Sequence, residues 1–196
     1  MAKEESLWAR FLLGFVLGVL AFPLTVVGYL TLGWAPAAST APPMPFERYI
    51  AGTALHNRIS REAPRREVSS FTTADLVAGA DIYKQNCAMC HGSYQEAAPA
   101  PAIAKGMYPE APQLLTAEGM VTDDPVGVTY WKVQNGIRLS GMPSFGRILK
   151  DQQKWDVSAL LARANMLPAE AQQALKNTPR IVRAPGAAGS RGKDEN

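Results

Sequence analysis

The longest apolar segment of the chain lies near its N-terminus. Residues 11–34 contain no charged side chain over 24 positions. A helix of that length rises about 36 Å, enough to cross a hydrocarbon core of ~30 Å. Trp8 and Trp34 lie near its two ends, where aromatic rings favour the membrane–water interface. A cleaved signal peptide is the alternative, but its apolar region usually covers only ~7–15 residues, so the pattern favours an uncleaved transmembrane anchor.

The next segment, residues 35–70, is rich in proline and then in charge. Four prolines stiffen its first part, and the charged part from Glu47 to Glu67 has room for a short helix that would break at Pro64. As a flexible coil, such a segment would have a root-mean-square span of ~35 Å. We therefore expect a linker between the anchor and whatever follows.

A helix is predicted from Thr72 towards Gly92. Thr72 followed three residues later by Asp75 is typical of a helix start. One face of this helix would carry residues at steps of three and four: Leu76, Gly79, Tyr83 and Cys87. Because glycine weakens a helix by up to ~1 kcal/mol relative to alanine, Gly79 indicates a place where another backbone approaches closely.

Two more helices are predicted, over residues 124–136 and 151–166. Asp124 offers a carboxylate N-cap and Pro125 a first helical position, and the Asn-Gly pair at the end of the segment is a typical stop. Pro168 ends the second of these helices.

The helix over residues 151–166 is expected to cross the helix that begins at Thr72. Trp155 would then pack against Gly79 and Tyr83, because small and large side chains interdigitate where two helices cross closely.

The remaining segments lack helical periodicity. Residues 93–123 are rich in proline and alanine but also contain large apolar side chains, which predicts a loop that wraps a core. Residues 178–196 are polar, basic and rich in small residues, which predicts a disordered tail.

The charge of the chain excludes one class of function. The formal net charge is +3, and residues 71–168 hold eight basic and nine acidic side chains, or about −1. No run of Lys and Arg alternates with aromatic residues, so we expect no nucleic-acid partner. Nor does so weak a charge create a strong docking field for a protein partner.

Residues 87–91 read Cys-Ala-Met-Cys-His and contain the only two cysteines of the chain. This spacing suits covalent haem attachment, in which Cys87 and Cys90 form thioethers and His91 reaches the iron. Such a histidine usually donates its other ring N–H to a carbonyl, and we expect the acceptor within residues 108–112.

Three other interpretations of this segment are less favoured. A thioredoxin-like redox pair needs strand-like runs in a βαβ unit, and none flanks Cys87. A structural zinc site needs four ligands, and the only other histidine is the distant His56. A chance match is the third. His56 itself is interpreted as an ordinary exposed or interface residue, because a better candidate for a second iron ligand lies downstream.

That candidate is Met142, which stands between Gly141 and Pro143. The two neighbours predict a rigid, non-helical turn, an unsuitable place for a methionine of a helical core. A thioether at the sixth position of the iron favours the ferrous state and raises the potential. The lesser candidates for this position are Met107, Met120 and Met166.

Three motifs follow one another in the order expected of a known family: Cys-Ala-Met-Cys-His-Gly, Asn-Gly-Ile-Arg-Leu-Ser-Gly-Met-Pro-Ser-Phe and Lys-Trp-Asp-Val-Ser-Ala-Leu-Leu. Because these motifs occur in this order, residues 72–167 resemble a monohaem, bacterial class I c-type cytochrome. The resemblance covers about half of the chain. It implies a small all-α fold around one covalent haem c, with Cys87 and Cys90 as thioether residues, His91 as the proximal ligand and Met142 as the distal ligand.

Together these features predict four regions and a function. The regions are the N-terminal residues and anchor, the linker, the haem domain, and a short helix with the tail: 1–34, 35–70, 71–168 and 169–196. We expect a membrane-tethered carrier of single electrons, or a redox subunit of a respiratory or related membrane complex, that is not an enzyme by itself. A haem sensor that binds a ligand and a structural subunit are the alternatives.

The expected location follows from the haem. Covalent haem attachment takes place outside the cytoplasm in bacteria, so we expect a single-pass protein of the inner membrane with its haem domain on the periplasmic side. The charges that flank the apolar segment, Lys3 and Arg10 before it and Arg48 after it, are too few to decide the orientation.

Overall fold

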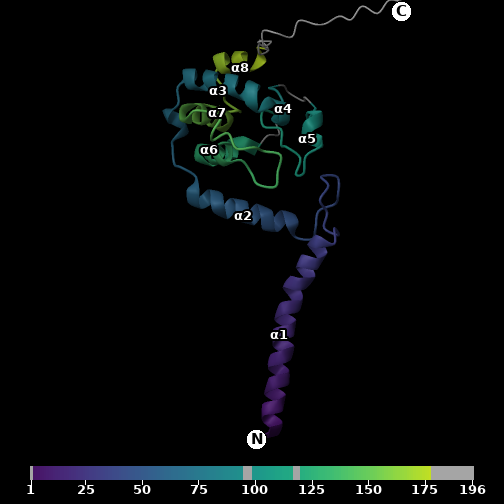
Figure 1. Ribbon diagram of the computed structural model, residues 1–196. Coiled ribbons are helices and arrows are strands. Elements are labelled where there is room, and N and C mark those ends of the chain that lie inside the picture. Colours follow the sequence, from purple (N-terminus) through teal and green to yellow (C-terminus); the bar gives the residue numbers. More distant parts are fainter. Residues whose placement is uncertain (1, 95–98, 117–119, 178–196) are drawn as a thin grey trace, which may run out of the picture. The chain divides into compact units, whose positions relative to one another are not determined.

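The computed structural model describes residues 2–94, 99–116 and 120–177, and within these ranges the chain forms helices and loops without a strand (Figure 1). The all-α prediction is confirmed. The α-helices are α1 (Ala2–Thr31), α2 (Glu47–Glu62), α3 (Thr73–Asn86), α4 (Ala88–His91), α5 (Ala102–Lys105), α6 (Val126–Asn135), α7 (Asp151–Ala162) and α8 (Ala169–Lys176), with short 3₁₀ helices η1 (Val68–Ser70) and η2 (Met120–Asp123). The predicted tail, residues 178–196, lies outside the described residues.

Helix α1 contains residues 11–31 of the apolar segment. Its part from Trp8 to Thr31 is long and apolar enough to cross a membrane, and its large apolar side chains are exposed. The helix continues through Pro23. Helices of this kind are also found as signal sequences, so length and composition establish only that α1 could be a membrane anchor.

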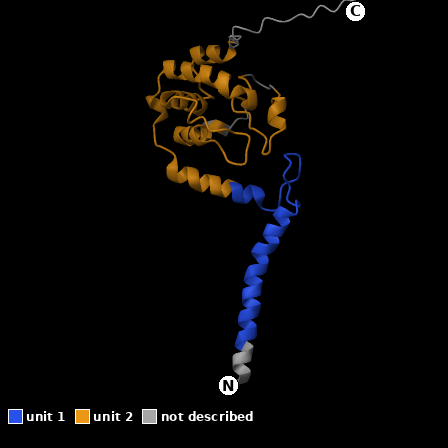
Figure 2. Ribbon diagram, in the orientation of Figure 1, with its two compact units in different colours: residues 1–51 blue, residues 52–196 orange. Residues whose placement is uncertain are grey.

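The chain divides into two compact units, residues 1–51 and residues 52–196 (Figure 2). The second unit contains most of the predicted linker helix as well as all the helices that follow it. Ile59 of α2 is 6% exposed, and Trp131 Nε1 donates a hydrogen bond of 3.0 Å to Glu62 Oε2. The carbonyl of Pro64 lies so close to Gly127 that a Cβ there would be 1.7 Å from its oxygen. The chain from Ile59 to Pro64 is therefore packed against α6.

Helix α3 begins where the sequence predicts. Thr72 is its N-cap, and Asp75 completes the capping box by accepting from the Thr72 backbone N–H at 2.8 Å. The helix ends at Asn86, before the predicted Gly92, because Cys87 leaves the helical path (φ −115°, ψ −38°) and starts the separate turn α4.

Helices α3 and α7 cross at Gly79. A Cβ at this position would lie 2.4 Å from the carbonyl oxygen of Asp156 and 3.1 Å from Leu160 Cβ. The expected close approach of another backbone is therefore confirmed.

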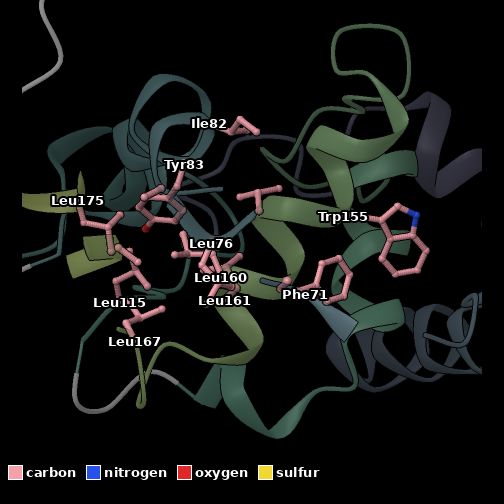
Figure 3. Packing of buried hydrophobic residues seen from close by; sticks show 14 of the residues in the cluster. Phe71, Leu76, Ile82, Tyr83, Leu115, Trp155, Leu160, Leu161, Leu167 and Leu175 are labelled. Atoms are coloured by element: carbon pink, nitrogen blue, oxygen red, sulfur yellow. The ribbon is translucent and has the colours of Figure 1, made fainter. Parts of the chain in front are cut away.

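The expected partners of Trp155 were wrong. Its ring stacks on Tyr130 at 4.1 Å between centroids and lies 6.2 Å from Phe71, whereas Tyr83 is at the other end of the hydrophobic cluster (Figure 3). The helices meet through the Asp156 backbone, one residue further on, and a rotation of about 100° per residue turns Trp155 away from the crossing.

Two more helix ends, and one additional short helix, differ from the predictions. Pro125 is the N-cap of α6, and the carboxylate of Asp124 instead pairs with Lys132 Nζ at 2.6 Å. The end of α6 at Gly136 (φ 68°) is as predicted. Helix α7 ends at Ala162, four residues early, and the loop 93–123 contains the short helix α5.

The core joins α3, α6, α7 and α8. Leu76 and Tyr83 of α3 are buried against Leu160 of α7, and α8 contributes Ala171 and Leu175 (Figure 3). Lys84 Nζ donates to the carbonyl of Ala174 at 2.6 Å, which places a cation at the C-terminal end of α8, where the helix dipole favours it. These helices form the framework on which α4 and the loops around it rest.

Candidate haem site

The helical turn α4, together with its N-cap Cys87, carries three of the four predicted site residues. The backbone N–H groups of Cys90 and His91 both donate to the carbonyl of Cys87, at 3.0 and 2.9 Å. Gly92, at φ 77°, then ends the turn in a conformation that side chains rarely adopt. The spacing of three and four residues places Cys90 and His91 on the same face as Cys87.

Both cysteines are free thiols and partly buried. Burial, with a smaller contribution from Cys90, raises the pKa of the Cys87 thiol to about 12. A thioredoxin-like pair needs an exposed thiol whose pKa is lowered, and the raised pKa disfavours Cys87 in that role. Within the described ranges, no three His, Cys, Asp or Glu side chains gather in a way that could hold a metal ion, which also disfavours the zinc interpretation.

His91 has one ring nitrogen engaged. Its Nδ1 lies 2.8 Å from the carbonyl oxygen of Pro112, within the segment predicted to supply the acceptor. A carbonyl only accepts, so Nδ1 carries a proton, and in the neutral imidazole Nε2 is then left with its lone pair. This is the tautomer that a metal-ligating histidine requires, and the hydrogen bond also fixes the orientation of the ring.

The backbone around His91 is held from two sides. The hydroxyl of Tyr83, a fully buried residue, lies 3.0 Å from the carbonyl oxygen of His91 and 2.8 Å from that of Gly92. From the loop, Leu114 N donates to the His91 carbonyl at 3.3 Å, and a Cβ on Gly92 would lie 2.0 Å from Gln113 Oε1. The residues Tyr83 and Gln113 were not predicted to hold α4. The position of Tyr83 one turn before Cys87 was the only available signal.

Met142 lies in the loop that follows α6. Its carbonyl accepts from Ile137 N at 3.2 Å, and its N–H donates to Ser140 Oγ at 3.2 Å. A Cβ on Gly136 would lie 2.9 Å from the Met142 carbonyl oxygen, so only glycine allows the loop to fold back this closely. Met142 is half-buried and, like Cys87, packs against the hydrophobic cluster of the core.

The lesser candidates occupy other positions. A Cβ on Gly141 would lie 2.5 Å from Met107 Sδ, so Met107 packs against the backbone beside Met142. Met166 is 75% exposed, and His56 is exposed on α2. The side chain of Met120 lies outside the described residues.

These residues fit a covalently bound haem. Two free thiols lie within one turn, the histidine beside them is hydrogen-bonded through Nδ1 and can ligate through Nε2, and a thioether is held in a rigid loop on the same core. The donor set of thiols, imidazole and thioether is the one that a c-type haem requires.

Comparison with known proteins agrees with this geometry. Residues 76–165 match the family model described as Cytochrome c. No curated protein gives a match to the chain, and no solved structure does. The matched region contains α4, with its Cys-x-x-Cys-His spacing, and the loop that carries Met142. Residues 76–165 therefore form a cytochrome c domain, and covalently bound haem c is the cofactor that such a domain implies.

Proposed function

We propose that this protein is a membrane-tethered monohaem cytochrome that transfers single electrons, as a carrier or as the redox subunit of a membrane complex. One observation carries the proposal: the hydrogen bond between His91 Nδ1 and Pro112 leaves Nε2 free to ligate. Haem c supplies an iron that alternates between the ferric and ferrous states.

Each site residue has a defined part in this function. Cys87 and Cys90 would hold the cofactor through thioethers, and His91 Nε2 and the Met142 sulfur would hold its iron. Held by both side chains, the iron would leave no position for a substrate and would supply electron transfer without bond formation.

The framework suits electron transfer because it resists rearrangement. Tyr83 and Leu114 bind the His91 carbonyl, and the hydrogen bond of Phe145 holds the following loop against α6, while those of Met142 fold that loop back on itself. Ligands that stay in place when the iron changes charge require little reorganisation of the protein at each transfer.

The membrane tether determines which redox partners the haem domain meets. We propose that α1 is an uncleaved anchor in the inner membrane, with the haem domain on the periplasmic side. Two proteins held in one membrane meet at a higher effective concentration than free ones, by the argument that applies to linked binding modules. The partners are then redox proteins of the same membrane, such as a respiratory complex.

Spectroscopy of the purified protein and of Met142→Ala tests the ligand assignment. The ferric wild type should show the weak long-wavelength absorption band of a methionine-ligated haem. Met142→Ala should lack this band and have a much lower reduction potential. Met107→Ala is the matched control, since it removes a neighbouring thioether and should leave the band in place. A wild type without the band, or a Met142→Ala variant that keeps it, would overturn the assignment.

Two further measurements separate the alternatives. A sensor with an open iron position would bind carbon monoxide in the ferrous wild type without displacing a ligand. A structural subunit would show no reversible couple in a reductive titration.

Mass determination of the protein from membranes distinguishes an intact N-terminus from a cleaved signal sequence.

A further inference from the structure

The C-terminal end of α6 is the platform on which the Met142 loop rests. Phe145 N donates to the carbonyl of Val133 at 3.0 Å, and Ser144 Oγ donates to the carbonyl of Gln134 at 2.7 Å. Met142 is only two residues from Ser144. Its position is therefore set by how firmly residues 144–146 are held against α6.

The side chain of Gln134 takes part in this contact. A Cβ on Gly146 would lie 2.6 Å from Gln134 Nε2 and 2.7 Å from the Gln134 carbonyl oxygen. The loop thus fits against both the backbone and the side-chain amide of one residue. If this side chain turned away, the loop would lose one of its supporting surfaces.

Lys154 of α7 fixes the side chain of Gln134. The Lys154 side chain is only 8% exposed, and its Nζ donates to Gln134 Oε1. Asp151 Oδ1 lies 3.4 Å from the same Nζ, and the ring of Tyr130 has its centroid 5.4 Å away. An ammonium group only donates, so it holds Oε1 on its own side and directs Nε2 towards the loop.

The buried ammonium group of Lys154 needs partners, because burying a charge costs free energy unless the charge is paired and hydrogen-bonded. Asp151 is largely exposed and supplies part of the pairing. The second partner, Gln134, is the residue on which the loop rests.

We propose that Lys154 is a positioning residue for the distal haem ligand. By orienting the amide of Gln134 it keeps residues 144–146 on α6, and in this way it keeps the Met142 sulfur at the iron. This inference rests on the proposed function, in which Met142 is the sixth ligand.

Imidazole is a suitable probe, because it binds ferric haem only when Met142 leaves. Its apparent affinity is proportional to the fraction of molecules whose loop is open. Lys154→Met removes the donor while keeping an apolar stem of similar length. Residues in one hydrogen-bond network are commonly coupled strongly enough to change an equilibrium several-fold, so Lys154→Met should bind imidazole roughly five- to tenfold more tightly.

Variants of Gln134 test the same link from the other side and remain informative if Lys154→Met does not fold. Gln134→Leu should increase the imidazole affinity as Lys154→Met does, and the double variant should add little. Gln134→Glu retains an oxygen acceptor for Lys154 and should keep the affinity within about twofold of wild type.

Lys84→Met is the matched control. It also removes a largely buried lysine that is hydrogen-bonded to the protein, here at 12% exposure, but this lysine holds α8 and not the loop. It should lower the stability of the protein and leave the imidazole affinity unchanged.

Each outcome has a defined meaning when the titrations are made on the full-length, haem-loaded protein. An unchanged affinity in both Lys154→Met and Gln134→Leu, with the methionine band present in wild type, overturns this inference alone. An equal rise in Lys84→Met would reduce the effect to general destabilisation and also overturn it. A wild type without the methionine band overturns the proposed ligand and the inference together.

Discussion

The crossing of α3 and α7 at Gly79 gives a stability prediction whose size follows from the structure. In Gly79→Ala, the new Cβ would lie 2.4 Å from the Asp156 carbonyl oxygen, whereas real Cβ atoms essentially never come closer than 3.0 Å. The two backbones must therefore separate by at least about 0.6 Å. The neighbouring side chain of Leu160 is fully buried and cannot move into free space.

Two opposing effects determine the magnitude. Overpacking of a well-packed core typically costs about 1–3 kcal/mol, and alanine recovers up to ~1 kcal/mol as a better helix former than glycine. We expect Gly79→Ala to lower the free energy of unfolding by about 1–2 kcal/mol. Gly79→Val should cost more, because it adds bulk and a β-branched side chain to the same contact.

Urea unfolding of the haem-loaded protein, followed by circular dichroism, measures this change. Gly52→Ala is the matched control: Gly52 lies inside α2, and a Cβ there meets no atom within 4 Å. This control should be as stable as wild type or slightly more stable. If Gly79→Ala were as stable as Gly52→Ala, the proposed close crossing of the helices would be refuted.

Two other predictions concern single groups. Tyr83→Phe should lower the free energy of unfolding by about 1–3 kcal/mol, because the buried Gly92 carbonyl loses its donor; an unchanged urea midpoint would contradict this. Burial raises the pKa of Asp156, so the folded state binds its proton more tightly than the unfolded state, and stability falls as the pH rises from about 4 through the raised pKa. Asp156→Asn should therefore be more stable than wild type at pH 7 and lose this advantage at about pH 3. Urea midpoints at both pH values measure the difference. An advantage that grew towards low pH would contradict the predicted sign.

Several features could be predicted because they depend on residues close in sequence. The capping box of Thr72 and Asp75 and the stop at Gly136 are both set by neighbours within four positions. The two glycines illustrate two kinds of signal. Gly136 ends a helix through its own φ, and Gly79 revealed a close contact because glycine has no other reason to lie inside a helix.

Prediction was less successful where the outcome depended on residues far apart in sequence. The predicted partners of Trp155 were wrong because each residue along a helix is rotated by about 100° from the last, so a shift of one position moves a side chain to a different face. Asp124 was expected to cap α6 but binds Lys132, eight positions further on, and spacing alone cannot decide between the two partners.

By itself the sequence determined the chemistry of this protein: the two thiols, the imidazole beside them, the thioether in its stiff turn, and an apolar segment long enough to cross a membrane. Tertiary structure decided which groups hold that chemistry in place. Pro112 fixes the tautomer of His91, Tyr83 holds the backbone of the turn, and Lys154 reaches Gln134 across two helices. The reason is physical, since ligand types are properties of individual side chains, whereas their orientation depends on carbonyls and amides that only the packing of distant segments brings within hydrogen-bonding distance.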